Sequence, residues 1–242
     1  MDNITYYILA ALASVIILTV HEYSHGYAAY KLGDDTAKQL GRLTLNPIRH
    51  IDPIGALCML LFRFGWAKPV PINPMRLRRP KRDLAIVAAA GPIINLILSF
   101  LSGAVVILLY RIVIMSITTS VLIGNILTVT YNFFLIFHVL NLGIAIFNLI
   151  PIPPLDGSRI LGLIIPDRLY VRILRHERTI YLVFICWLLA GSLVSRFLLS
   201  IPVIAKNTVL CEIIDWITLS GFIGKIVDFL SSAILSFWKL IF

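Results

Sequence analysis

The sequence contains several long apolar runs that carry no Asp, Glu, Lys or Arg, and these runs constrain the fold more than any other feature. They cover residues 3–20, 84–110, 112–155 and 179–195. A helix needs about 20 apolar residues to cross the hydrocarbon core of a bilayer, so runs of this length are typical of membrane-spanning helices. The composition excludes an ordinary water-soluble domain, because 59% of the residues are hydrophobic and only 14% are charged. We therefore expect an all-α integral membrane protein with several spans.

The basic residues lie in two blocks that the apolar runs separate. Of the 21 Lys and Arg residues, 11 lie between Lys31 and Arg82 and five between Arg159 and Arg178. Cytoplasmic loops carry such an excess of Lys and Arg, so we expect both blocks in the cytoplasm and the N-terminus outside. Anchoring at anionic lipid headgroups also explains the net charge of +9, and no nucleic-acid partner is expected.

Both basic blocks reach the same side only if residues 112–155 cross the membrane once. After the first span, residues 37–73 carry seven Gly and Pro residues around short apolar runs. We expect strands and loops associated with the membrane there, because irregular backbone at that depth must be satisfied by protein or by a wet cavity. We therefore expect residues 1–200 to form the intramembrane core, with at least four spans at about 4–30, 84–112, 121–150 and 179–199.

The remaining residues, 201–242, are predicted to form an apolar and amphipathic tail. Lys225, Asp228, Ser232 and Lys239 recur there at helical spacing among large apolar residues. A helix with such a polar stripe suits the membrane interface better than the lipid core. The sequence leaves open whether the tail crosses the membrane or lies at the interface.

The first apolar run ends in the sequence His21-Glu22-Tyr23-Ser24-His25. Residues i and i+4 share one face of a helix, so both imidazoles can reach one metal ion while Glu22 borders the same site. The alternative is a pair of buried histidines that only pack in a core. Ionisable groups within a membrane span are costly and usually functional, which favours the metal site.

The end of the 112–155 run can supply a third ligand. Zinc at a catalytic site usually takes three protein ligands and leaves a fourth position for water. Three prolines that cannot continue a helix precede Asp156, and Gly157 lets the backbone turn sharply. The Asp156 carboxylate can therefore turn back toward the histidines. Two alternatives stay open: Asp156 as the N-cap of the next helix, and His138 as the ligand.

Two asparagines lie near these motifs. Asn148 lies eight residues before Asp156, and its amide can donate a hydrogen bond to an oxyanion as charge develops there. It can equally hydrogen-bond backbone groups that the prolines leave free. Asn95 follows Gly91 and Pro92 within an apolar run, and we expect it to pack or to form an interhelical hydrogen bond.

These motifs carry a family resemblance. The HEYSH sequence on a membrane helix, followed by Asn148 and Leu155-Asp156-Gly157, resembles the site-2 protease family of intramembrane zinc metalloproteases, in its compact prokaryotic type without a PDZ or CBS domain. The resemblance covers roughly residues 15–165. It implies that His21, His25 and Asp156 bind one Zn²⁺ ion per chain, that Glu22 is the catalytic acid and base, and that Asn148 assists at the scissile carbonyl. Further matching motifs are NPIRHIDPIG at 46–55, GWAKPVP at 65–71 and AGPIIN at 90–95.

The function expected from the resemblance is hydrolysis of peptide bonds within or near the transmembrane helix of membrane-protein substrates. It would serve regulated intramembrane proteolysis or the clearance of signal-peptide remnants, in a prokaryotic plasma membrane. The alternative from another class is an intramembrane metal-binding transporter or sensor, and a minor one is an inactive relative that binds membrane helices. The substrate, the regulatory trigger and the oligomeric state do not follow from the sequence.

Overall fold

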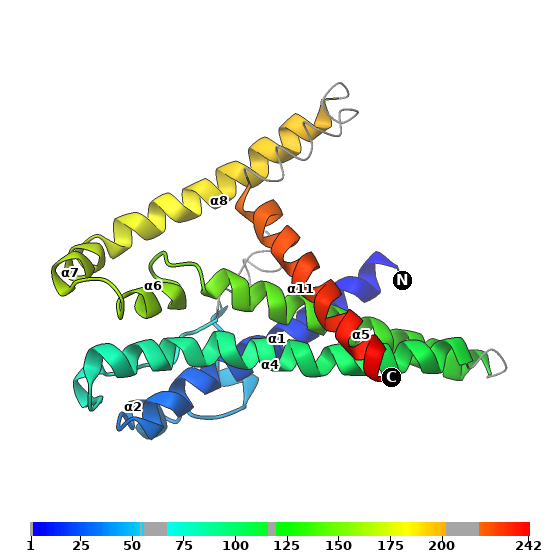
Figure 1. Cartoon of the computed structure of the whole chain (residues 1–242), viewed down its shortest axis with the longest axis horizontal. Coiled ribbons are helices and arrows are strands. Elements are labelled where there is room, and N and C mark those ends of the chain that lie inside the picture. Colours follow the sequence, from blue (N-terminus) through cyan, green and yellow to red (C-terminus); the bar gives the residue numbers. More distant parts are fainter. Residues whose placement is uncertain (1, 54, 56–66, 116–119, 202–217) are drawn as a thin grey trace.

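The structure is a computed structural model that describes residues 2–53, 55, 67–115, 120–201 and 218–242. Most of its described residues are helical (Figure 1). The long helices are α1 (Asn3–Lys31), α4 (Pro80–Met115), α5 (Val121–Asn148), α8 (Glu177–Ser200) and α11 (Leu219–Ile241), and the short ones are α2 (Thr36–Gln39), η1 (Pro47–Arg49), η2 (Pro74–Arg76), α6 (Asp156–Leu161) and α7 (Asp167–Arg175).

Four helices among the described residues are long and apolar enough to cross a membrane by length and composition: α1, α4, α5 and residues Gly221–Ile241 of α11. This confirms the all-α membrane class with at least four helices of spanning length. The run at 179–199 forms α8 as a helix, but it is not among these four, and several of its side chains lie outside the described ones. The tail helix, predicted to suit the interface, is apolar enough to cross.

Helices α1, α4 and α5 form the bundle that positions the site, and α8 runs at an angle away from it (Figure 1). Leu9, Ala13 and Ile17 of α1 are buried against Ile136 and Phe137 of α5. The three α1 residues recur every four positions, so they share one face of the helix. His21 and His25 lie further along the same helix and are also buried within the bundle.

Helix α11 packs across α4 and α5 on the outside of this bundle. His138 of α5 is fully buried there and contacts α4 and α11: its Nδ1 lies 2.9 Å from Ser99 Oγ, and its Nε2 lies 3.0 Å from Ser231 Oγ. Trp238 Nε1 donates to the Phe100 carbonyl at 2.9 Å. His138 is therefore not a metal ligand in this structure, because both of its ring nitrogens face serines of other helices.

The strands expected within residues 37–73 are not found among the described residues of that segment. A single antiparallel bridge joins Ile51 to Ala67, and the Lys68 N–H donates to the His50 carbonyl at 2.8 Å. On the described outer side of this bridge, Pro69 and Pro71 lack the N–H that a ladder needs, which explains why the pairing does not extend there. The part of the prediction that falls on residues 54 and 56–66 lies outside the described residues.

Residues 67–73 are extended and are tied to the end of α1. The carboxylate of Asp34, which is fully buried, accepts the backbone N–H of Thr36 at 3.0 Å and that of Asn73 at 2.6 Å. Arg42 donates to the Lys68 carbonyl at 2.9 Å. These bonds hold the segment against the face of α1 that carries Glu22.

Candidate metal centre

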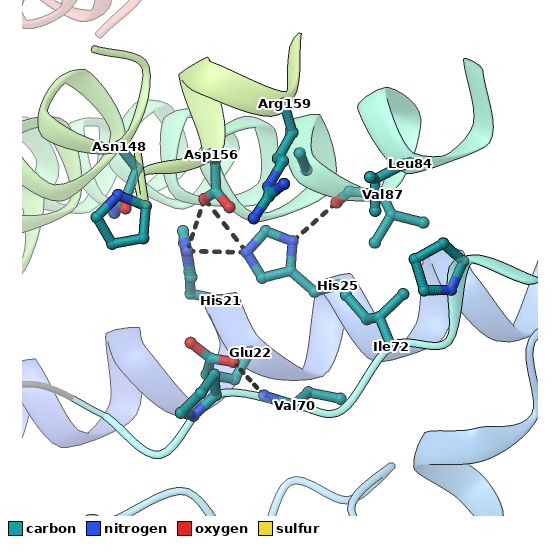
Figure 2. A pocket seen from close by; sticks show the side chains of 14 residues that line it. His21, Glu22, His25, Val70, Ile72, Leu84, Val87, Asn148, Asp156 and Arg159 are labelled. Carbon is teal, nitrogen blue, oxygen red and sulfur yellow. Dashed lines mark hydrogen bonds and ion pairs between the residues drawn. The ribbon is translucent and has the colours of Figure 1, made fainter. Parts of the chain in front are cut away.

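The two histidines of α1 and Asp156 of α6 meet inside the bundle (Figure 2). The Nε2 atoms of His21 and His25 lie 3.0 Å apart, and each lies 3.3 Å from Asp156 Oδ2. Both histidines are buried, at 4% and 6% exposure. The structure thus brings together the three residues that the sequence predicts as ligands, although 130 residues lie between His25 and Asp156.

The chain between α5 and α6 places the aspartate. After α5 ends, the chain passes through the three prolines, and α6 begins at Asp156 with Leu155 as its N-cap. Asp156 is therefore the first helical residue rather than the cap, and its carboxylate faces the imidazoles (Figure 2). Gly157 serves a different purpose from the sharp turn expected: a Cβ there would lie 2.5 Å from the Ile150 carbonyl oxygen, so only glycine allows this close approach.

The donor set fits zinc. Asp156 Oδ2 is buried and, among the described residues, contacts no hydrogen-bond donor besides the two imidazoles. Burial raises the pKa of the Asp156 carboxyl, but the two imidazoles beside it outweigh burial and lower that pKa to about 2. The group is therefore an anion at neutral pH. Two imidazoles and one carboxylate match the ligands of known catalytic zinc sites and leave a position for water.

The face of α4 supports the histidines. His25 Nδ1 lies 2.8 Å from the Val87 carbonyl oxygen, which can only accept, so Nδ1 carries the proton and Nε2 keeps its lone pair for a metal. Gly91 lies one turn further along α4, and a Cβ there would come within 2.5 Å of both His21 Cε1 and His25 Nε2. Glycine at this position allows the two rings to sit directly against the helix.

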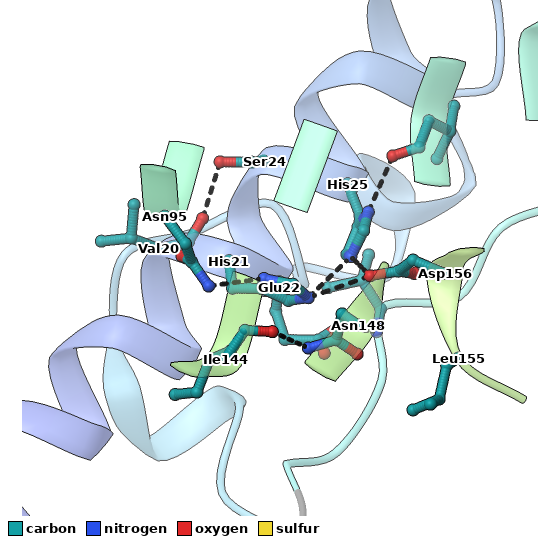
Figure 3. Close-up of polar contacts among 12 residues, drawn as sticks. Val20, His21, Glu22, Ser24, His25, Asn95, Ile144, Asn148, Leu155 and Asp156 are labelled. Atoms are coloured by element: carbon teal, nitrogen blue, oxygen red, sulfur yellow. Dashed lines mark hydrogen bonds and ion pairs between the residues drawn. The ribbon is translucent and has the colours of Figure 1, made fainter. Parts of the chain in front are cut away.

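A cavity of about 410 Å³ opens beside the three candidate ligands. Glu22 borders it, and its Oε2 accepts the Val70 backbone N–H at 2.8 Å (Figure 2). Asn148 also borders it, with Nδ2 donating to the Ile144 carbonyl of its own helix at 3.0 Å (Figure 3). This acceptor is a carbonyl within α5 and not one that the prolines leave free, so both roles considered for Asn148 stay predictions.

Three contributions to the site were missed by the reasoning from sequence. The Val87 carbonyl is a backbone group and leaves no signal in the sequence. Arg159 lines the cavity and donates to Glu177 Oε1 at 2.8 Å; its place three residues after Asp156 on one helix is the signal that points to it. Asn95 was expected only to pack or to bridge helices, but its Nδ2 lies 3.1 Å from His21 Nδ1.

The chain is similar to proteins named as putative zinc metalloproteases. The model of Peptidase family M50 matches residues 9–191. The chain is 39% identical over 190 residues to the "Putative zinc metalloprotease YwhC" of Bacillus subtilis. The matched region covers 76% of this chain and 84% of that protein. It is 30% identical over 149 residues to the "Putative zinc metalloprotease Rip2" of Mycobacterium tuberculosis, covering 59% of this chain and 52% of that protein, about half its length. No solved structure matches the chain. The chain belongs to peptidase family M50, the site-2 protease family.

Proposed function

We propose that this protein is an intramembrane zinc metalloprotease that hydrolyses peptide bonds within or near the transmembrane helix of membrane-protein substrates. The observation that carries the proposal is the meeting of His21, His25 and Asp156 beside Glu22 in a chain of the M50 family. The relatives named as zinc metalloproteases support zinc as the metal. His21 Nε2, His25 Nε2 and Asp156 Oδ2 would hold one zinc ion per chain.

Zinc held there would act as a Lewis acid, polarising a peptide carbonyl and lowering the pKa of a water molecule. Glu22 takes the proton from the attacking water and later gives it to the leaving amine. The Val70 N–H holds Oε2 of Glu22, so the carboxylate is oriented before substrate arrives, and Oε1 is the oxygen that transfers the proton. Asn148 would donate its second N–H to the oxygen of the scissile carbonyl.

The substrate must lose its helical hydrogen bonds at the cleavage site, because a helix engages its own carbonyls. The unwound stretch would lie along residues 67–73, of which Pro69, Val70 and Ile72 line the cavity. Prolines at 69 and 71 lack N–H groups, and Arg42 already occupies the Lys68 and Pro69 carbonyls. We therefore expect few main-chain hydrogen bonds and mostly apolar contact along this edge.

Water would enter the cavity from the side of the basic segments. Leu84, near the start of α4, lines the cavity, and basic residues surround that end of the helix at positions 76–82. By the positive-inside rule this end is cytoplasmic and the N-terminus is outside. In a prokaryotic cell this membrane would be the plasma membrane.

The test uses the purified full chain and a single-span substrate in proteoliposomes. Glu22→Gln should abolish cleavage while about one zinc ion per chain stays bound, because glutamine can still accept the Val70 N–H but cannot act as a base. Asp156→Ala should lose both zinc and cleavage. Asp167→Asn is the control, since this carboxylate is exposed and pairs with Lys81 away from the ligands.

Two results would contradict the proposal. Full cleavage by Glu22→Gln would show that Glu22 is not the acid and base. Full zinc content in Asp156→Ala would show that Asp156 is not the third ligand. Zinc flux across the proteoliposome membrane without cleavage of any substrate would favour the transporter alternative instead.

A further inference from the structure

Asn95 of α4 is a buried polar side chain that touches one of the two candidate histidine ligands. It has no exposed surface, and its Nδ2 lies 3.1 Å from His21 Nδ1 (Figure 3). Its Oδ1 is also buried and contacts no hydrogen-bond partner within the described part of the chain. An unpartnered amide oxygen next to an imidazole inside a membrane protein is costly, and it needs a physical reason.

The neighbouring histidine shows what that reason is. Residues 87, 91 and 95 recur every four positions, so they share the face of α4 that meets the histidine pair. Val87 offers its carbonyl oxygen to His25 Nδ1 at 2.8 Å, and Asn95 occupies the equivalent place beside His21 Nδ1. Each ring is thus held at Nδ1 by α4 while its Nε2 faces Asp156.

Coordination decides which end of the Asn95 amide must face the ring. A neutral imidazole that binds a metal through Nε2 carries its proton on Nδ1, and that N–H needs an acceptor. A half-turn of the amide about its last side-chain bond places Oδ1 where Nδ2 lies now. Oδ1 then accepts from His21 Nδ1, and the oxygen without a partner gains a donor.

We propose that Asn95 is a positioning residue for the metal centre: its side-chain oxygen accepts the His21 Nδ1 proton and so directs His21 Nε2 toward the metal. This inference rests on the proposed function, because it takes His21 as a zinc ligand. Asn95 acts only through His21 and does not touch the metal or the substrate.

The first test compares variants of the full chain in detergent by competition of Zn²⁺ with a chelator of known affinity. Asn95→Leu removes the acceptor at similar volume and should weaken zinc binding by about 10- to 100-fold, the usual loss when the partner of a ligating histidine is removed. Asn95→Asp keeps the acceptor and lacks the amide donor, so it should bind zinc at least as tightly as the wild type. Asn141→Leu is the matched control, since Asn141 is equally buried but donates to its own helix at the Phe137 carbonyl.

The second test needs no variant at position 95. Histidine ¹⁵N spectra of the zinc-loaded wild type, assigned with His21→Ala, should show the His21 proton on Nδ1. A proton on Nε2 would overturn the inference, as would Asn95→Asp losing zinc as fully as Asn95→Leu, or Asn95→Leu keeping wild-type affinity. If His21→Ala itself keeps zinc, the proposed function fails. If His21→Ala loses zinc but Asn95→Leu keeps it, the proposed function stands and the role assigned to Asn95 is wrong.

Discussion

Substituting Gly91 by alanine is the sharpest test of how the bundle shapes the metal centre. The added Cβ would lie 2.5 Å from His21 Cε1 and 2.5 Å from His25 Nε2. Non-bonded carbon atoms normally approach no closer than about 3.5 Å, so each ring must retreat by about 1 Å or α4 must move. Metal ligands tolerate displacements of only about 0.2 Å. We expect Gly91→Ala to pull at least one imidazole out of coordinating distance.

The same change should cost little stability. Overpacking a core costs about 1–3 kcal/mol, while alanine in a helix interior gains about 0.5–1 kcal/mol over glycine. The net loss, about 0–2.5 kcal/mol by these two estimates, leaves the protein folded. Loss of a direct ligand should weaken zinc binding by at least about 100-fold, since removing only the partner of a ligand costs 10- to 100-fold.

The assay pairs chelator competition for zinc with thermal unfolding of the detergent-solubilised protein and with substrate cleavage. The control is Gly143→Ala on α5, where a Cβ would meet no described atom within 4 Å. The control should keep zinc, cleavage and stability, whereas Gly91→Ala should still fold and unfold cooperatively but lose zinc and cleavage. Wild-type zinc affinity in Gly91→Ala would refute the reasoning, because the rings would then have room that the structure does not show.

Two further predictions concern contacts away from the ligands. Asp34→Ala should lower the free energy of unfolding by about 1–3 kcal/mol, because it leaves buried N–H groups unpaired. It should also slow cleavage by releasing the segment that carries Val70. Asp35→Ala is the control: its ion pair with Arg76 is exposed, so neither stability nor cleavage should change. Ser231→Ala should lower thermal stability by about 0.5–1.5 kcal/mol through loss of the hydrogen bond to His138, with zinc retained. Ser232→Ala should have no such effect, since this hydroxyl bonds within its own helix. Equal behaviour within either pair would contradict the contact assigned to it.

Much of the architecture can be predicted from local patterns. Uncharged apolar runs indicate α1, α4 and α5, because a backbone in lipid must satisfy its own hydrogen bonds. The spacing of His21 and His25 places both imidazoles on one helix face, and the prolines before Asp156 predict that the chain leaves the helix there. These inferences depend on a few neighbouring residues at a time, and periodicity is a property of such short stretches.

Other features depend on which helix faces pack together, and no local pattern encodes them. Asp156 reaches the histidines because α6 packs on α4, which itself packs on α1. Asn95 and the Val87 carbonyl meet the rings because one face of α4 packs there. Among the described residues of 37–73 the pairing is the Ile51–Ala67 bridge, and the place of α11 follows from its contacts with α4 and α5. Local propensity selects helices and their apolar faces, while side-chain volumes at distant positions, such as the missing Cβ of Gly91, select how those faces meet.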